Sequence, residues 1–259
     1  MKILRLQPAT GEFYPAGMQR LDYASAVDSQ CDWALLRAGD RRELWIVVLH
    51  GHGAHGDQLY TRRDVRENWL PEFLATGAGI VTLNLRGNAW MSPAAASDLH
   101  DIIEYLRAEF GMQKTVFCSG SMGGTGNLIY GVLYPGDVGG IVARGAATDL
   151  GSYYKWCTTQ TRPILREIAD AIRAAYGADP GQAPEIYRRH SAQANADRLA
   201  MPVYLAHGAA DQTIPVQQAQ MLADKLRAKK DFCYREIPGG NHDSPLHDPQ
   251  ALAWVSQRI

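Results

Sequence analysis

The sequence predicts an α/β fold in which a mostly parallel, twisted sheet of about eight strands carries helices on both faces. Three observations predict it. Short apolar runs rich in β-branched residues recur along the chain, and helix-like segments separate them. The composition is that of an ordinary globular protein, with 46% hydrophobic and 20% charged residues.

Six strands are expected from residue 43 onward, and the first five are short apolar runs of the kind buried on both faces of a sheet. The six strands cover residues 43–50, 79–85, 114–121, 138–146, 201–208 and 232–239. The first 43 residues hold less regular strand material, such as 31–39, which suits antiparallel strands at one edge.

Helices are expected at residues 97–111, 123–135, 216–230 and 248–259. The residues at the ends of these segments agree with this prediction. Ser97 and Asp98 stand where an N-cap is wanted, Gly111 follows the last turn of that helix, and Pro215 precedes the helix from 216.

Residues 151–200 interrupt the alternation of strands and helices. They contain one helix-like run at 163–177, and about fifty residues are too many for an ordinary connection. We therefore expect one domain spanning residues 1–259, with 151–200 as a short insertion or partial lid that follows the sixth strand and lies over the sheet. Tyr153, Tyr154 and Trp156 either line a substrate pocket there or pack the insertion onto the body.

Charge, cysteines and hydropathy exclude several classes of function. The net charge is −1, and the charge runs at 62–67 and 227–231 suit solvated helix faces, so no nucleic-acid partner is expected. The four cysteines form no C-x-x-C pair, which argues against a structural zinc knuckle or a redox motif. No apolar run approaches a membrane span, and the N-terminus lacks a signal-peptide pattern, so we expect a soluble cytoplasmic protein. A secreted form whose signal peptide has been removed is the alternative, and the oligomeric state is left open.

The stretch CSGSMGGTGN at 118–127 joins a predicted strand to a predicted helix. It approximates G-x-S-x-G, the sharp turn that exposes a serine hydroxyl above a sheet, with Ser121 in the serine position. Ser119 replaces the first glycine, which is a departure from the pattern. Small-residue turns of this kind also occur for packing or phosphate binding. The motif therefore indicates a catalytic serine only if partner residues, a base and an acid, are found elsewhere in the sequence.

Two such partners follow later strands. Asp211 comes just after the strand at 201–208, and His242 lies in the loop after the last strand. A serine needs an adjacent base, and the base needs an acid to hold its tautomer. The order serine, acid, histidine, with each residue at the carboxyl end of a strand, makes coincidence a poor explanation. Asp243 adjoins His242 too closely to orient it.

This ordered set resembles the α/β-hydrolase superfamily over residues 44–259. The tail PVYLAHGAADQTIP…GGNHD and the segment EIYRRHSAQANADRLAMP are similar to its prolyl-oligopeptidase-like and esterase branch. The resemblance implies that Ser121, Asp211 and His242 form a catalytic triad, with Asp149 as a rival acid because some members carry the acid one strand earlier. It also implies that the backbone N–H of His52 or Gly53, together with that of Met122, forms the oxyanion hole.

The stretch VVLHGHGAHGDQL at 47–59 also admits a metal site, because His50, His52, His55 and Asp57 fall within eight residues. A dinuclear metallohydrolase has the pattern H-x-H-x-D-H, however, and Ala54 occupies the slot of its aspartate. Further ligands in a matching layout are missing. We therefore expect His50 to be a buried hydrogen-bonding residue, and His55 and Asp57 to brace the loop or contact substrate.

The sequence thus predicts a serine hydrolase that cleaves a small carboxylic ester through an acyl-enzyme, without a cofactor or metal. Glycan esters such as feruloyl or acetyl sugars, short acyl esters and small amides all stay open as substrates. The alternatives are a prolyl-oligopeptidase-like peptidase or amidase, a metal-dependent hydrolase using the 50–57 cluster, and a non-catalytic binding protein of the same fold.

Overall fold

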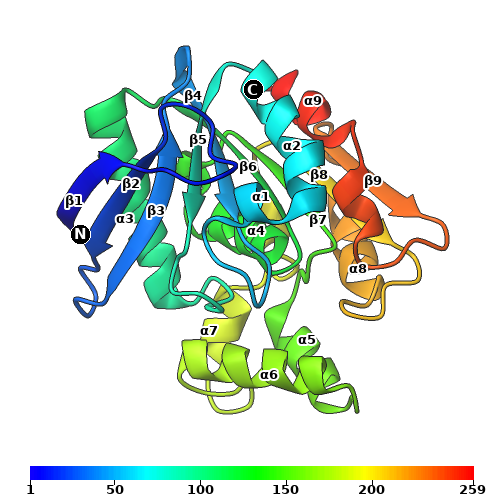
Figure 1. Cartoon of the computed structure of the whole chain (residues 1–259). Coiled ribbons are helices and arrows are strands. Elements are labelled where there is room, and N and C mark those ends of the chain that lie inside the picture. Colours follow the sequence, from blue (N-terminus) through cyan, green and yellow to red (C-terminus); the bar gives the residue numbers. More distant parts are fainter.

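The computed structural model describes all residues from Met1 to Ile259, and nine strands form one sheet in the order β1-β2-β3-β5-β4-β6-β7-β8-β9 (Figure 1). In this order, the three neighbouring pairs β1–β2, β2–β3 and β3–β5 are antiparallel. All other neighbouring pairs, from β5–β4 to β8–β9, are parallel. The strands are β1 (Lys2–Pro8), β2 (Gln19–Ala24), β3 (Cys31–Arg37), β4 (Arg41–Leu49), β5 (Ala78–Leu83), β6 (Lys114–Gly120), β7 (Gly140–Arg144), β8 (Val203–Gly208) and β9 (Phe232–Ile237).

The predicted fold class is confirmed, with one more strand than expected. The extra strand lies in the N-terminal region, where β1, β2 and β3 form an antiparallel meander. The insertion therefore follows the seventh strand of the sheet and not the sixth.

Nine α-helices accompany the sheet. They are α1 (Gln58–Thr61), α2 (Arg63–Ala75), α3 (Pro93–Phe110), α4 (Met122–Leu133), α5 (Leu150–Thr158), α6 (Pro163–Tyr176), α7 (Pro184–Arg189), α8 (Gln217–Leu226) and α9 (Ala251–Ser256). No helix is both long enough and apolar enough to cross a membrane.

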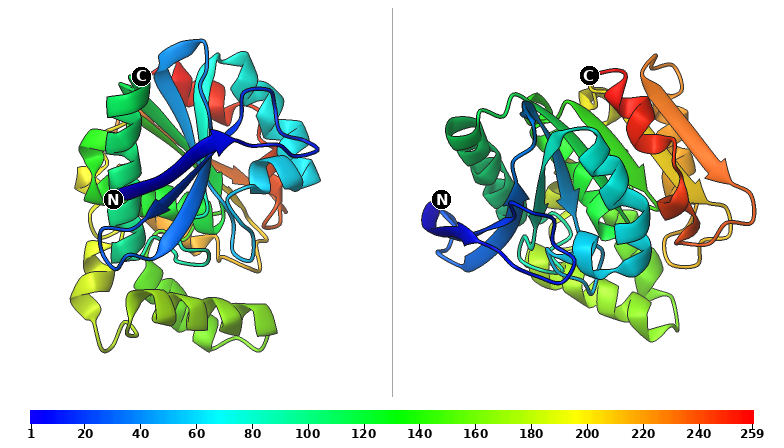
Figure 2. Two further views of the ribbon diagram at one scale, coloured as in Figure 1. Left: turned by 60° about the vertical axis from the view of Figure 1, so that its left-hand side comes forward. Right: turned by 45° about the horizontal axis from the view of Figure 1, so that its top comes forward.

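The sheet is covered on both faces because alternate residues of its central strands enter two separate cores. In β4, Trp45 and Val47 join a core of 49 residues with α3, α4 and α8. Leu44 and Ile46 join a core of 22 residues with α1, α2 and α9. Figure 2 shows the two helix layers on either side of the twisted sheet. The two-residue period of a strand thus explains why the apolar runs in the sequence are continuous.

The helices α5, α6 and α7 lie together at one end of the sheet, apart from the helices on its faces (Figures 1 and 2). All three come from residues 151–200 or their immediate border. The apolar side of α6 packs inward through Leu165, Ile168 and Ile172, which belong to the larger core. The segment is therefore tied to the body by buried apolar contacts.

A buried ion pair anchors the loop that follows β5. Arg86 has a positive φ of 64° and its side chain is only 9% exposed. Its Nε donates to Asp98 Oδ2 on α3 at 2.5 Å, and its Nη atoms reach Asp28 at 2.8 and 2.9 Å. Ser25 Oγ donates to the other Asp98 oxygen. The N-terminal meander, the loop and α3 are thus joined through one guanidinium group.

Replacing Asp98 with Ala should lower the free energy of unfolding by about 3 kcal/mol, because the buried Arg86 loses its partner. Asp170→Ala is the control, since Asp170 pairs with Arg173 on the surface of α6, where an ion pair contributes about 0.5 kcal/mol. Urea unfolding of both variants makes the comparison. Equal losses in the two would contradict the anchoring role of Asp98.

Candidate active site

The turn between β6 and α4 holds Ser121 in a strained backbone conformation. Its φ of 55° and ψ of −125° are unusual for a residue other than glycine, and such strain costs on the order of 1–3 kcal/mol. The turn is held by the N–H of Ser121, which donates to the carbonyl of Arg144 at the end of β7 (2.8 Å). The result is a serine hydroxyl at the carboxyl edge of the sheet.

Close packing explains the small residues around Ser121. A Cβ on Gly123 would collide with the carbonyl oxygens of Leu49 and His50, so α4 can start this near to β4 only with glycine there. Ser119, the departure from the motif, is fully buried. Its hydroxyl accepts the N–H of Leu49 (2.9 Å) and donates to Asn127 of α4 (3.2 Å), so it ties the turn to both neighbours.

The structure brings together Ser121, His242 and Asp211, the three residues that the sequence places after separate strands. His242 Nε2 lies 2.9 Å from Ser121 Oγ, and His242 Nδ1 lies 2.7 Å from Asp211 Oδ2. Gly208, at the end of β8, lets the loop bearing His242 cross closely, because a Cβ there would strike the carbonyls of that loop. An alcohol in hydrogen-bond contact with an imidazole, itself held by a carboxylate, can be activated as a nucleophile.

Asp211 is buried and remains ionised. Burial raises the pKa of its carboxyl, but hydrogen bonds from His207 and His242, together with the backbone N–H of Ile214, outweigh burial and hold the pKa well below its usual range. The backbone N–H groups of Thr213 and Ile214 donate to Oδ1 at 2.7 and 2.9 Å. The carboxylate is therefore oriented as well as charged when it faces His242.

In the loop after β4, the backbone N–H of His52 has no protein acceptor, and His52 lines the same cavity as Ser121. The N–H of Gly51 donates to Gln58 Oε1 (2.8 Å), and that of Gly53 donates to Asn88 Oδ1 (2.8 Å). Between them, the N–H of His52 donates to no acceptor in the protein. Met122 is the first residue of α4, so its N–H has no partner four residues back within the helix. Of the two candidates in this loop, His52 has the available N–H and Gly53 does not.

The side chain of His52 is held by the neighbouring loop. Trp90 Nε1 donates to His52 Nδ1 at 3.2 Å, so the ring carries its proton on Nε2, which lies 3.4 Å from Glu167 of α6. Burial lowers the pKa of His52, and the nearby Glu167 carboxylate opposes that shift. The imidazole is thus used to fix the loop and its contact with α6.

The other polar side chains of residues 50–57 do not converge on a common point. The ring of buried His50 faces the carbonyls of Gly51 and Asn84 at 2.8 and 2.9 Å. His55 is exposed, and Asp57 makes no side-chain cap, although its carbonyl starts α1. The side-chain arrangement therefore gives the metal interpretation of this cluster no support.

The aromatic residues of α5 and the rival acid serve the packing of the insertion. Tyr153 is fully buried, stacks on Trp156 and donates to the carbonyl of Thr213 (3.0 Å). Asp149 caps α5 by accepting the N–H of Ser152 (2.7 Å) and also accepts the hydroxyl of Ser191. None of these residues, nor Tyr154, His55 or Asp57, lines the cavity at Ser121.

A cavity of about 170 Å³ opens over Ser121 and His242. Trp69 forms part of its wall, and its Cη2 would be 3.7 Å from a Cβ placed on Gly120. The Trp69 ring is fixed by a hydrogen bond from Nε1 to the carbonyl of Leu246 (2.7 Å) and by the guanidinium of Arg144 stacked 4.6 Å from it. The apolar lining comes from several elements and comprises Val48, Leu49, Leu59, Val65, Trp69, Ile164, Ile168 and Leu246.

Sequence reasoning missed these wall residues. Trp69 lies on α2, whose charged start at 62–67 suits a solvated helix face, and Pro71 obscured the buried face that follows. Ile164 and Ile168 lie four apart on α6, a spacing that signals a buried helix face but not what the face meets. Asn88 and Trp90 gave no signal at all in a single sequence.

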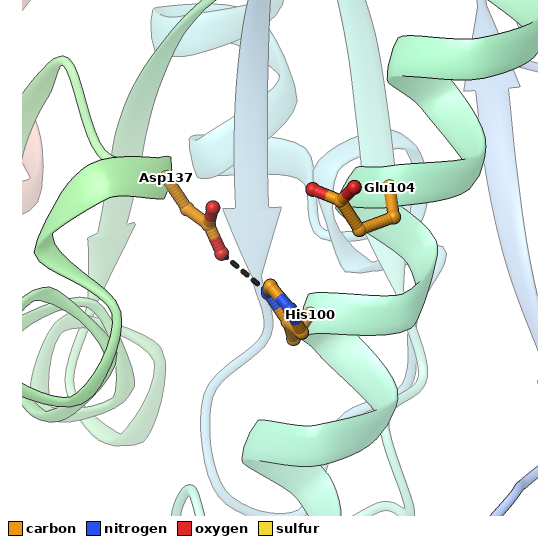
Figure 3. A group of neighbouring side chains, drawn as sticks. All are labelled: His100, Glu104 and Asp137. Atoms are coloured by element: carbon orange, nitrogen blue, oxygen red, sulfur yellow. Dashed lines mark hydrogen bonds and ion pairs between the residues drawn. The ribbon is translucent and has the colours of Figure 1, made fainter.

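One further group of side chains has the spacing of metal ligands, at His100, Glu104 and Asp137 (Figure 3). Asp137 is already engaged, since it accepts hydrogen bonds from His100 (2.8 Å), Tyr130 (2.6 Å) and Arg107 (2.8 Å). Arg107 also pairs with Glu104. The arginine supplies the positive charge between the two carboxylates, and the group joins α3 to α4 and the short turn that follows it.

Fold and site together define a serine hydrolase with the α/β-hydrolase architecture. The family model for the alpha/beta hydrolase fold matches residues 45–165, which include the loop after β4 and the turn at Ser121.

Among particular proteins, the chain is similar to a monoacylglycerol lipase of Mycolicibacterium smegmatis, with 24% identity over 233 residues that cover 76% of this chain and 80% of the lipase. The solved structure of a fluorophosphonate-binding serine hydrolase, FphF of Staphylococcus aureus, has a TM-score of 0.70 and 12% identity, covering 95% of this chain and all of the other. The structure of a putative dipeptidyl aminopeptidase IV of Bacteroides ovatus has a TM-score of 0.73 and 17% identity, and the match covers 93% of this chain but only 36% of that longer chain. The structural likenesses describe the fold.

Replacing Gly123 with Ala should lower the free energy of unfolding by about 2 kcal/mol or more, because the new methyl group must displace backbone carbonyls. Gly136→Ala is the matched control, since nothing lies within 4 Å of a Cβ at that exposed position. Thermal and urea unfolding measure both. A Gly123 variant as stable as the control would contradict the packing of α4 on β4.

Proposed function

We propose that this serine hydrolase cleaves carboxylic esters through an acyl-enzyme formed on Ser121. His242 removes the proton of Ser121 as its oxygen attacks the acyl carbon, and then gives that proton to the leaving alcohol. Asp211 holds the tautomer of His242 and stabilises its cation. A water activated by His242 then releases the acid and restores the serine.

The observation that carries this proposal is the continuous chain from Asp211 through His242 to Ser121, with contacts of 2.7 and 2.9 Å. It ends in a cavity, beside a loop whose central N–H has no protein acceptor. We assign the oxyanion to the N–H groups of His52 and Met122, because preorganised donors stabilise the tetrahedral intermediate. The occupied N–H of Gly53 supports His52 as the donor from this loop.

The cavity favours small esters with an apolar acyl group. Its walls beside Ser121 are largely apolar, and Gln58, Arg62, Thr213 and Asp243 supply polar groups elsewhere in the lining. The relative from Mycolicibacterium smegmatis is named a monoacylglycerol lipase, which agrees with an ester substrate. Feruloyl and acetyl sugar esters are retained as test substrates.

Treatment with a fluorophosphonate tests the reaction directly, because the reagent captures an activated serine. We expect one adduct per chain, located by mass spectrometry on Ser121, and no adduct in Ser121→Ala or His242→Ala. Asp211→Asn should label more slowly and lose about four orders of magnitude in kcat, since the imidazole then adopts the wrong tautomer.

Hydrolysis of p-nitrophenyl esters and of matched p-nitroanilides by the same preparation distinguishes an esterase from an amidase. Asp149→Asn serves as the control for the acid, because Asp149 caps α5 away from His242. A folded wild-type protein that gains no adduct, or whose labelling depends on Asp149 and not on Asp211, would refute the proposal.

Trp69 should limit the length of the acyl chain. Trp69→Ala removes the wall beside Gly120, and we expect kcat/KM for octanoate relative to acetate esters to rise about tenfold, the effect of a few additional buried methylene groups. Trp254→Ala, on α9, should leave the ratio unchanged. A parallel series of acetates with longer alcohols reports the leaving-group side. If only that series responds to Trp69→Ala, Trp69 borders the alcohol and not the acyl group.

A further inference from the structure

A second histidine stands behind the acid of the site. His207 is the penultimate residue of β8, is fully buried, and lies four residues before Asp211. Its Nε2 lies 2.9 Å from the carbonyl oxygen of Ile214 and 3.2 Å from Asp211 Oδ2, the oxygen that also contacts His242. Nothing in the reaction described above uses it.

The protonation of His207 follows from its neighbours. Both atoms facing Nε2 are acceptors, so Nε2 carries a hydrogen. Nδ1 is buried without any hydrogen-bond partner, which leaves it unprotonated in a neutral ring. A buried nitrogen without a partner is unfavourable, and it persists here while the opposite nitrogen serves two acceptors. The contacts of Nε2 with Ile214 and Asp211 therefore determine how the ring of His207 is oriented.

We propose that His207 is a positioning residue for Asp211, a role that rests on the proposed function. The segment 211–214 folds back on itself, with the N–H groups of Thr213 and Ile214 donating to Asp211 Oδ1. His207 closes this turn from the other side by holding the carbonyl of Ile214 and facing Oδ2. The carboxylate is thereby fixed against rotation, with Oδ2 directed at His242 Nδ1.

His207 is also the one support of Asp211 that substitution can remove cleanly. Thr213 and Ile214 act through backbone groups, and His242 is the base itself. The charged groups around the ring are Asp211 and, on the paired strand β9, Glu236, whose register partner is His207. Tyr153 covers the same turn through the carbonyl of Thr213.

Two amide side chains test the proposal with little change in polarity. The amide of Gln reaches about as far from the backbone as Nε2 of histidine, whereas the amide of Asn reaches only as far as Nδ1. We expect His207→Gln to retain kcat and the rate of fluorophosphonate labelling within a few-fold. His207→Asn should lose about tenfold or more in both, the effect of one hydrogen bond to a charged group, with KM nearly unchanged.

Tyr204→Phe is the matched control. Tyr204 is buried on the same strand and donates to the carboxylate of Asp248 (2.7 Å), which has no contact with the site. Removal of the Tyr204 hydroxyl should lower the melting temperature and leave kcat unchanged. The melting temperature of each variant separates lost stability from lost orientation, and His207→Leu provides a further variant without a donor if His207→Asn does not fold.

The outcomes separate the two proposals. If the wild-type protein is labelled on Ser121 and the Gln and Asn variants behave alike, the role of His207 is wrong and the proposed reaction stands. If the Asn variant loses rate only in proportion to its unfolded fraction, His207 is merely structural. If the wild-type protein is not labelled, the proposed reaction itself fails.

Discussion

The site depends on one constraint, the sharp turn that carries the chain from β6 into α4 through Ser121. The turn requires a positive φ at a residue with a side chain, and it brings α4 against the end of β4. Such strain is stable only where the surrounding structure over-determines it. Here the surroundings are the carbonyl of Arg144, the buried hydroxyl of Ser119 and the close contact at Gly123. The half-buried Ser121 lines the cavity because the residues beneath the turn are closely packed.

The loops around that turn are positioned by hydrogen bonds that converge from distant parts of the chain. The loop after β4 is held on both sides of His52, by Gln58 from α1 and by Asn88 and Trp90 from the loop after β5. That second loop is itself anchored by Arg86 to Asp98 on α3. The N–H of His52, which has no protein acceptor, is therefore placed by a chain of contacts that ends in the core, and rigid donors of this kind are what oxyanion stabilisation needs.

The sequence located the parts of the site that are local. Ser121 directly follows the buried strand β6, Asp211 comes shortly after the buried strand β8, and His242 lies in the loop after the edge strand β9. Parallel strands bring their carboxyl ends to one edge, so strand recognition alone places these residues together. The walls of the cavity were not predictable in this way. Trp69, Ile164 and Ile168 meet Ser121 only through tertiary packing of α2 and α6. The antiparallel meander was also underestimated, because exposed edge strands such as β1 alternate weakly between buried and exposed residues.

The histidine-rich loop shows how a residue pattern and its use can differ. Four side chains with the chemistry of metal ligands lie within eight residues, yet His50 braces a turn, His52 receives the indole N–H of Trp90, and Asp57 and His55 contribute carbonyls to the start of α1. In the proposed reaction this loop contributes a backbone donor, the N–H of His52, and such a donor does not discriminate between acyl groups. In the proposed reaction, discrimination between acyl groups would therefore come from side chains of other elements that line the cavity. Among them, Trp69 lies on α2, a helix of the body, whereas Ile164 and Ile168 lie on α6, in the segment inserted between β7 and β8. The chemistry can thus stay fixed by the sheet while the helices around it set which ester is accepted.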